Sequence, residues 1–104
     1  MLSVSCGFRA RYPTERARAI AGIKNDLYNL GLLSGMSQSV FHGDLHSVGT
    51  TARRIRIGVV PYLQTLNDYP NVRALWQGAV EEIIGDYMAA AERNMRQRRD
   101  NHNL

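Results

Sequence analysis

The fold is decided by residues 71–99, which read NVRALWQGAVEEIIGDYMAAAERNMRQRR. At about 100° per residue, the apolar side chains of this stretch recur at helical spacing and spread over roughly 220° of the helical wheel. A surface helix usually carries an apolar stripe only about 100° wide. A helix with so wide an arc is therefore either central in its own domain or shared with a second molecule. The arc consists of Val72, Leu75, Trp76, Ala79, Val80, Ile83, Ile84, Tyr87 and Met88.

The chain has 104 residues, which is the usual length of one domain with one core. We therefore expect a single helical domain over residues 1–104, with an extended arm at 1–11 and a polar tail at 100–104. The apolar fraction of 44% and the charged fraction of 21% are typical of a globular protein. The net charge is +4, and Lys24 is the only lysine among 13 basic residues. Arginine suits phosphate or carboxylate partners, although genomic base composition produces the same bias.

Cysteine content and hydropathy limit the environment of the protein. Cys6 is the only cysteine, so neither an internal disulfide nor a cysteine zinc site is expected. The first residues lack the apolar core of a secretory signal, and no apolar run approaches the roughly 18 residues of a membrane span. We expect a soluble, cytoplasmic protein.

The remaining patterns are mostly helical. Leu2, Val4, Cys6 and Phe8 alternate with small or polar residues, which predicts a short strand or arm that lies against helices or a partner chain. A helix begins near Pro13 and ends before Gly31, and residues 31–46 form a packed loop with about one helical turn. Residues 47–60 and 61–67 form two helical pieces separated at Pro61, although residues 54–59 also alternate like a strand. The expected fold is all-α, with three to four helices and a short extended N-terminal arm or strand.

The string His42-Gly43-Asp44-Leu45-His46 is similar to the catalytic-loop motif of aminoglycoside phosphotransferases. That resemblance implies an aspartate base and a magnesium-binding asparagine three residues after the motif. Here Gly49 stands in place of the asparagine, no glycine-rich phosphate loop precedes the string, and the chain is too short for two lobes. We therefore predict neither a kinase nor a metal site, and no enzyme or cofactor.

Residues 33–41, LSGMSQSVF, resemble the turn of a helix-turn-helix repressor. The resemblance implies that Gly35 forms the turn, Met36 enters the core, and Gln38 and Ser39 face base edges. Gly43 and Asp44 depart from the pattern. Arginines that are able to neutralise phosphates occur in two clusters, Arg53, Arg54 and Arg56, and Arg93, Arg96, Arg98 and Arg99. A nucleic-acid-binding regulator that uses residues 30–46 or these arginines is the alternative function.

The first hypothesis is a non-enzymatic regulatory or adaptor protein that forms a homodimer through its long C-terminal helix. Aromatic residues are enriched among interface hot spots, which favours this helix as the interface. The expected interface residues are Trp76, Val80, Ile83, Ile84 and Tyr87. A second apolar set would receive another protein, for example a transcription factor, as small bacterial antiactivators of similar size do. That set comprises Leu32, Leu33, Met36, Val40 and Phe41.

Overall fold

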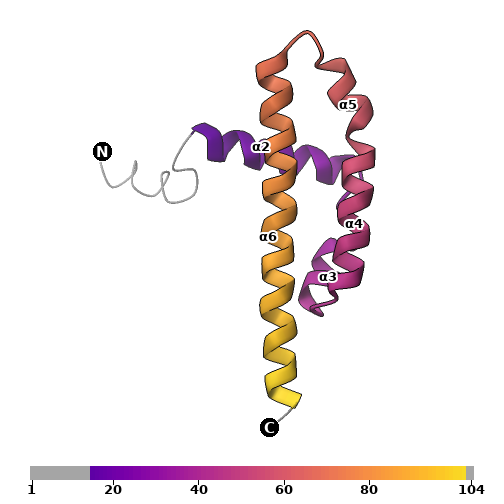
Figure 1. The fold of residues 1–104 in the computed structure, drawn as a ribbon, viewed down its shortest axis with the longest axis vertical. Helices are drawn as coiled ribbons and strands as arrows, with labels where there is room; N and C mark the ends of the chain where they lie inside the picture. Colours follow the sequence, from indigo (N-terminus) through magenta and orange to yellow (C-terminus); the bar gives the residue numbers. More distant parts are fainter. Residues whose placement is uncertain (1–14, 103–104) are drawn as a thin grey trace, which may run out of the picture.

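The computed structural model describes residues 15–102, and this part of the chain is all-α (Figure 1). The predicted extended arm at residues 1–11 lies outside the described residues. The predicted polar tail begins at residue 100, but the last helix continues to His102, so its first three residues are helical. The helices are α2 (Glu15–Asn29), α3 (Met36–Phe41), α4 (Leu45–Gly58), α5 (Val60–Thr65) and α6 (Pro70–His102).

The division between α4 and α5 follows from Pro61. Proline lacks a backbone N–H, so the helical hydrogen-bond ladder is interrupted at this point. Val59 ends α4 and also precedes the first turn of α5, in which Pro61 is tolerated. The prediction of two helical pieces is confirmed, and residues 54–59, which alternate like a strand, lie in helix up to Gly58.

Helix α6 is the centre of the fold. Helices α4 and α5 run antiparallel to it on one side, α2 crosses behind it, and α3 fills the space between α4 and the C-terminal half of α6 (Figure 1). The molecule measures 53 × 42 × 19 Å. Its smallest dimension is close to two helix diameters, which are about 10 Å each, so the protein is a flat, two-layered body.

Most of the wide apolar arc of α6 is covered by the chain's own helices, and Val72 at its start is exposed. Trp76 is only 8% exposed, and Tyr62 of α5 stacks on its indole with ring centroids 5.1 Å apart. The buried core residues are Ile23, Leu27, Leu33, Met36, Val48, Ala52, Ile55, Val59, Leu63, Trp76, Ala79, Val80, Ile83, Ile84 and Ala91. Of the two alternatives that the arc allowed, the central position is therefore the observed one.

This burial bears on the predicted dimer interface, which stays a prediction. Trp76, Val80, Ile83 and Ile84 lie inside the single chain because α2, α4 and α5 each cover a different sector of α6. These four side chains are therefore not available to a second copy. Tyr87 is half-buried and is the only one of the five predicted interface residues that keeps substantial exposure.

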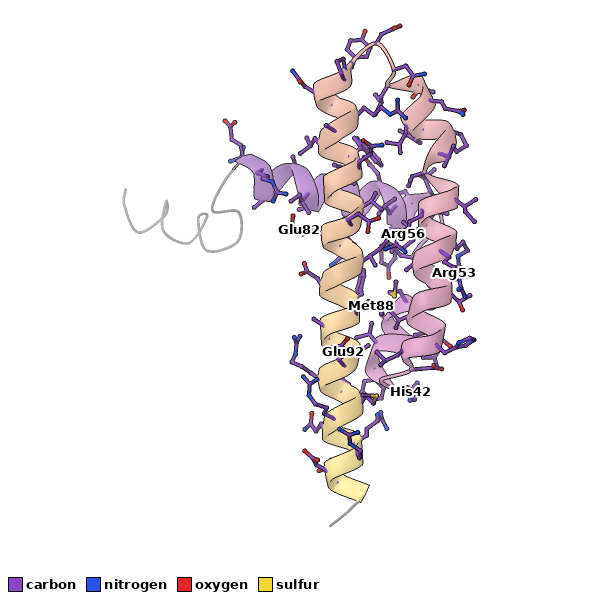
Figure 2. All side chains as sticks on the ribbon, in the orientation of Figure 1. His42, Arg53, Arg56, Glu82, Met88 and Glu92 are labelled. Carbon is purple, nitrogen blue, oxygen red and sulfur yellow. The ribbon has the colours of Figure 1, made fainter. Side chains whose placement is uncertain are left out.

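Two adjacent carboxylates tie α6 to different helices. Glu81 accepts two hydrogen bonds from the guanidinium of Arg56 on α4, each 2.9 Å long. Glu82 forms an ion pair with Arg16 on α2, at 2.8 Å. Neighbouring residues on a helix point about 100° apart, so one dipeptide reaches two neighbours. Figure 2 shows Arg56 between α4 and α6, and Glu82 on the side of α6 toward α2.

Candidate interaction surface at the α2–α3 turn

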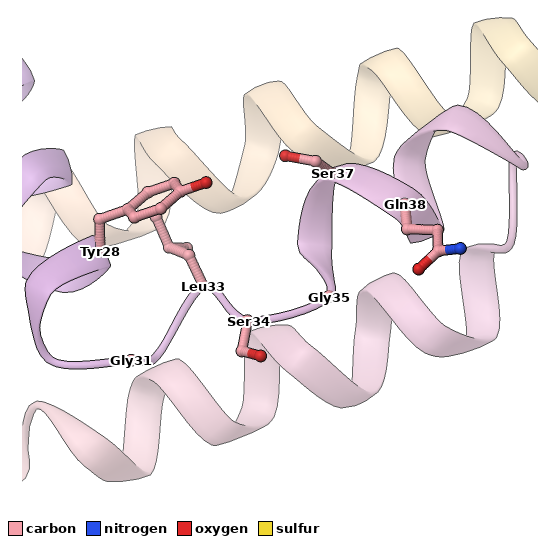
Figure 3. Close-up of a pocket in the computed structure, with 7 residues that line it drawn as sticks. All are labelled: Tyr28, Gly31, Leu33, Ser34, Gly35, Ser37 and Gln38. Carbon is pink, nitrogen blue, oxygen red and sulfur yellow. The ribbon is translucent and has the colours of Figure 1, made fainter.

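A hollow of about 440 Å³ lies where the end of α2, the following turn and the start of α3 meet (Figure 3). Its lining combines hydroxyl, amide and small residues with one aromatic ring, and it contains no formally charged side chain. The lining residues are Tyr28, Gly31, Leu33, Ser34, Gly35, Ser37 and Gln38.

Two glycines shape this hollow. Helix α2 ends in a Schellman motif, in which Gly31 donates to the carbonyl of Tyr28 and Leu32 donates to the carbonyl of Leu27, at 3.0 and 3.1 Å. Gly31 has a φ of 76° and Gly35 has a φ of 79°, in the left-handed region that favours glycine. The backbone therefore bends twice within five residues, and the predicted helix stop at Gly31 is confirmed.

The predicted partner-binding set divides between the core and the surface. Leu33 and Met36 are buried, and Met36 is only 1% exposed. Leu32 and Val40 are half-buried, while Phe41 is 65% exposed. Met36 is therefore not available to a partner, because it anchors the short helix α3 to the core.

The sequence reasoning missed the exposed aromatic side chain that lines the hollow, Tyr28, next to Leu30 near the end of α2. Tyr28 is 63% exposed and Leu30 is nearly half exposed. Tyr28 lies near the C-terminal end of α2, about 100° around the helix from the buried Leu27 and therefore at the border of the apolar face. An aromatic residue outside the buried positions of the helix was the available signal.

The helix-turn-helix resemblance corresponds to a different local structure. Met36 does enter the core, but α3 ends after six residues and is therefore short for a recognition helix. Gln38 is exposed and lines the hollow, whereas the hydroxyl of Ser39 donates to the carbonyl of Gly35 at 2.9 Å. Asn94 of α6 donates to the carbonyl of Val40 at 2.8 Å, which holds the end of α3 against the central helix.

Two of the three arginines of α4 are bound within the chain. Arg54 donates to the carbonyl of Ser34 at 2.7 Å, and Arg56 binds Glu81. The hydrogen bond from Arg56 lowers the pKa of the Glu81 carboxyl. Arg53 is exposed, and its only described contact is a 3.5 Å hydrogen bond to Thr50 (Figure 2). Two residues of the first arginine cluster therefore connect parts of the fold, whereas Arg53 is exposed to solvent.

The kinase-like string has a structural explanation. Gly43 is buried with a φ of 66°, and a Cβ at this position would lie 2.6 Å from the backbone nitrogen of Met95. Asp44 caps α4 by accepting hydrogen bonds from the backbone N–H and the hydroxyl of Ser47, which lower the pKa of its carboxyl. The exposed side chain of His42 lies at the end of α3 (Figure 2).

Comparison with known protein families, with curated proteins and with solved structures finds no match to this chain. Among residues 15–102, no three histidine, cysteine, aspartate or glutamate side chains are grouped closely enough to hold a metal ion. The same part of the chain contains no helix long and apolar enough to cross a bilayer. The fold and this surface define a small all-α domain.

Proposed function

We propose that the protein is a non-enzymatic adaptor that binds a protein partner through the hollow at the α2–α3 turn. The observation that carries the proposal is the composition of this surface: an exposed tyrosine beside serines, glycines and a glutamine, without formal charges. Tyrosine provides a large, rigid contact area at low entropic cost, and serine and glycine provide adaptable contacts. The centres of protein interfaces are likewise depleted of charged residues.

The lining offers the hydroxyls of Tyr28, Ser34 and Ser37, and it places no carboxylate or imidazole beside them that could act as a base. These hydroxyls are therefore available as hydrogen-bonding groups to a partner. The ring of Tyr28 adds exposed apolar area to the same lining.

In its specific form, the proposal is that of a cytoplasmic bacterial regulator that sequesters a transcription factor as an antiactivator. Its mechanism is competition: the neutral surface of the adaptor occupies the interface that the partner needs for its own assembly. A homodimer remains part of this proposal, but its contacts must lie outside the buried core of α6. Light scattering at micromolar concentration measures the oligomeric state.

The test uses two tyrosines with equal exposure. Tyr28 and Tyr69 are both 63% exposed, but Tyr69 lies at the α5–α6 turn, away from the hollow. We expect Tyr28→Ala to lose the partners that the wild-type chain captures from its host, measured by affinity purification and mass spectrometry. Tyr69→Ala should retain them. Equal capture by wild type and Tyr28→Ala would contradict the proposal.

The second candidate function is nucleic-acid binding through the end of α6. Arg93, Arg96 and Arg99 are exposed on its last turns, and none forms an ion pair or hydrogen bond within residues 15–102. Such binding weakens linearly with salt on logarithmic axes, so fluorescence anisotropy with duplex DNA at low and high salt tests it. The absence of binding at low salt would exclude this function.

A further inference from the structure

A second hollow lies in the corner where α2 crosses α6, away from the α2–α3 turn. It has a volume of about 370 Å³ and is lined mainly by apolar side chains, among them Ile20 and Ala21 of α2 and Ile83, Tyr87 and Ala90 of α6. Ile20, Ala21, Tyr87 and Ala90 are only half-buried. The crossing of two helices thus leaves an apolar corner that the rest of the described chain does not fill.

We propose that the N-terminal segment of the same chain, residues 1–11, occupies this corner. The segment joins the fold at Glu15, five residues before Ile20, which is a distance of about 8 Å along α2. Fourteen residues precede Glu15, and they span up to about 45 Å when extended. The α6 wall of the corner, from Ile83 to Ala90, is only about 10 Å long, so the segment reaches it with residues to spare.

The sequence of the segment matches an apolar groove. Leu2, Val4, Cys6 and Phe8 alternate with small or polar residues, so in an extended conformation all four share one face. In the corner, this face covers the apolar side chains of the wall that the rest of the described chain leaves half-exposed. Burial of such area removes apolar surface from water and is therefore favourable.

Charge complementarity favours the same occupant. Residues 1–14 contain Arg9 and Arg11 and no acidic residue. Asp86 lies at the rim of the corner, is exposed, and forms no ion pair within residues 15–102. Lys24 closes another part of the rim, with its ammonium 4.9 Å from the centroid of the Tyr87 ring. With the segment in the corner, its basic residues Arg9 and Arg11 therefore lie near the carboxylate of Asp86 at the rim.

The occupied corner also bears on self-association. Tyr87 is the one predicted interface residue that keeps substantial exposure, and it lies on this wall. A segment of the same chain in the corner removes this apolar surface from contact with a second copy. A homodimer would then make its contacts outside both this corner and the buried core of α6.

The single cysteine of the chain makes the test direct. Cys6 is the only native thiol, so a second cysteine placed on the corner wall reports contact by forming a disulfide. Ala90→Cys and Ala21→Cys place that thiol on the two walls, and Ala74→Cys is the control. Ala74 is exposed on α6, about 24 Å along the helix from Ala90. Far-UV circular dichroism verifies that each variant folds like the wild type.

The variants are oxidised with copper phenanthroline and resolved by non-reducing electrophoresis and mass spectrometry. We expect an intramolecular disulfide to form about tenfold faster in Ala90→Cys or Ala21→Cys than in Ala74→Cys, because a docked segment raises the effective concentration of Cys6 at the wall. Equal rates in all three variants would overturn the proposal. Disulfide-linked dimers specific to the corner variants would also overturn it, because they would show that the segment of a second copy occupies the corner.

Discussion

The two halves of α6 differ in how much of their surface the rest of the chain covers. From Trp76 to Ala91 the helix supplies six buried core residues and is packed against α2, α3, α4 and α5. From residue 96 to residue 101 every side chain is exposed. The first half is stabilised by apolar packing, whereas the second depends on helix propensity and a few polar contacts.

The contacts of the second half come mainly from one short segment. Asn94 and Arg98 donate hydrogen bonds to the carbonyls of Val40 and Phe41, and the guanidinium of Arg98 also lies 5.2 Å from the centroid of the Phe41 ring. Gly43 packs against the backbone of Met95. One continuous helix can therefore lie in the core of a domain at one end and be almost fully exposed to solvent at the other.

The largest effect is expected from Trp76→Ala, which tests whether the first half is held by packing within one chain. Loss of a buried tryptophan should reduce the free energy of unfolding by about 4 kcal/mol, measured by urea denaturation. Val72→Ala is the control on the same helix, because Val72 is 43% exposed, and it should cost less than about 1 kcal/mol. A small loss for Trp76→Ala together with a change in oligomeric state would instead place this residue between protomers.

A smaller loss is expected from Gly43→Ala, which tests the attachment of the second half. The new Cβ would overlap the backbone of Met95 and would force alanine into a left-handed conformation, at a combined cost of about 3 kcal/mol. Gly49→Ala is the matched control, because a Cβ added at this position in α4 would meet no neighbouring atom within 4 Å. It should stabilise the protein by up to about 1 kcal/mol, as alanine does in a helix. Similar unfolding curves for both variants would show that the α3–α4 turn does not pack on α6.

The smallest effect is expected from Glu81→Gln, which tests the polar tie between α4 and α6. The pair with Arg56 is exposed and screened by solvent, so its loss should cost about 0.5 kcal/mol at neutral pH. Arg56 lowers the pKa of Glu81 below its usual value of 4.5, so the folded protein binds this proton less readily than the unfolded chain. The contribution is therefore complete above about pH 4.5 and is lost as the pH falls through the lowered pKa.

The variant and the wild type should accordingly converge in stability at acidic pH, as measured by thermal unfolding between pH 7 and pH 3. Glu92→Gln is the control, because Glu92 is exposed and forms no ion pair within the described part of the chain. A constant difference between wild type and Glu81→Gln at every pH would contradict the assigned pair.

Helical periodicity, Pro61 and Gly31 predicted the positions of α2, α4, α5 and α6 to within a few residues, whereas α3 lies in the segment predicted as a packed loop with about one helical turn. The width of the apolar arc around Trp76 also predicted several neighbours for α6. The width of the arc did not indicate whether those neighbours belong to the same chain or to a second copy. An apolar side chain is buried equally well by helices of its own chain and by helices of a partner. The dimer interface was therefore assigned to residues that the single chain encloses.

The candidate interaction surface was harder to predict for a related reason. In residues 31–46 the apolar side chains were the visible signal, and the most buried position of the short helix, Met36, is the one that anchors it. Tyr28 was not singled out because its spacing places it at the border of the apolar face of α2, outside the buried positions. The hydrophobic pattern of a sequence identifies the side chains that the fold buries, whereas a contact surface consists of the side chains that remain exposed.

The adjacent carboxylates Glu81 and Glu82 have a consequence for the tolerance of α6 to insertions and deletions. Glu81 binds Arg56 of α4 and Glu82 binds Arg16 of α2, so the two carboxylates mark the two sides of α6 on which these helices pack. Deletion of one residue between Trp76 and Glu81 would rotate all later residues of α6 by about 100° around the helix axis. Glu81 and Glu82 would then both point away from their arginine partners. Insertion of four residues, slightly more than one turn, would return the later residues to nearly the same side of the helix. The effect of a change in the length of α6 therefore depends on how far it turns the downstream residues around the helix axis.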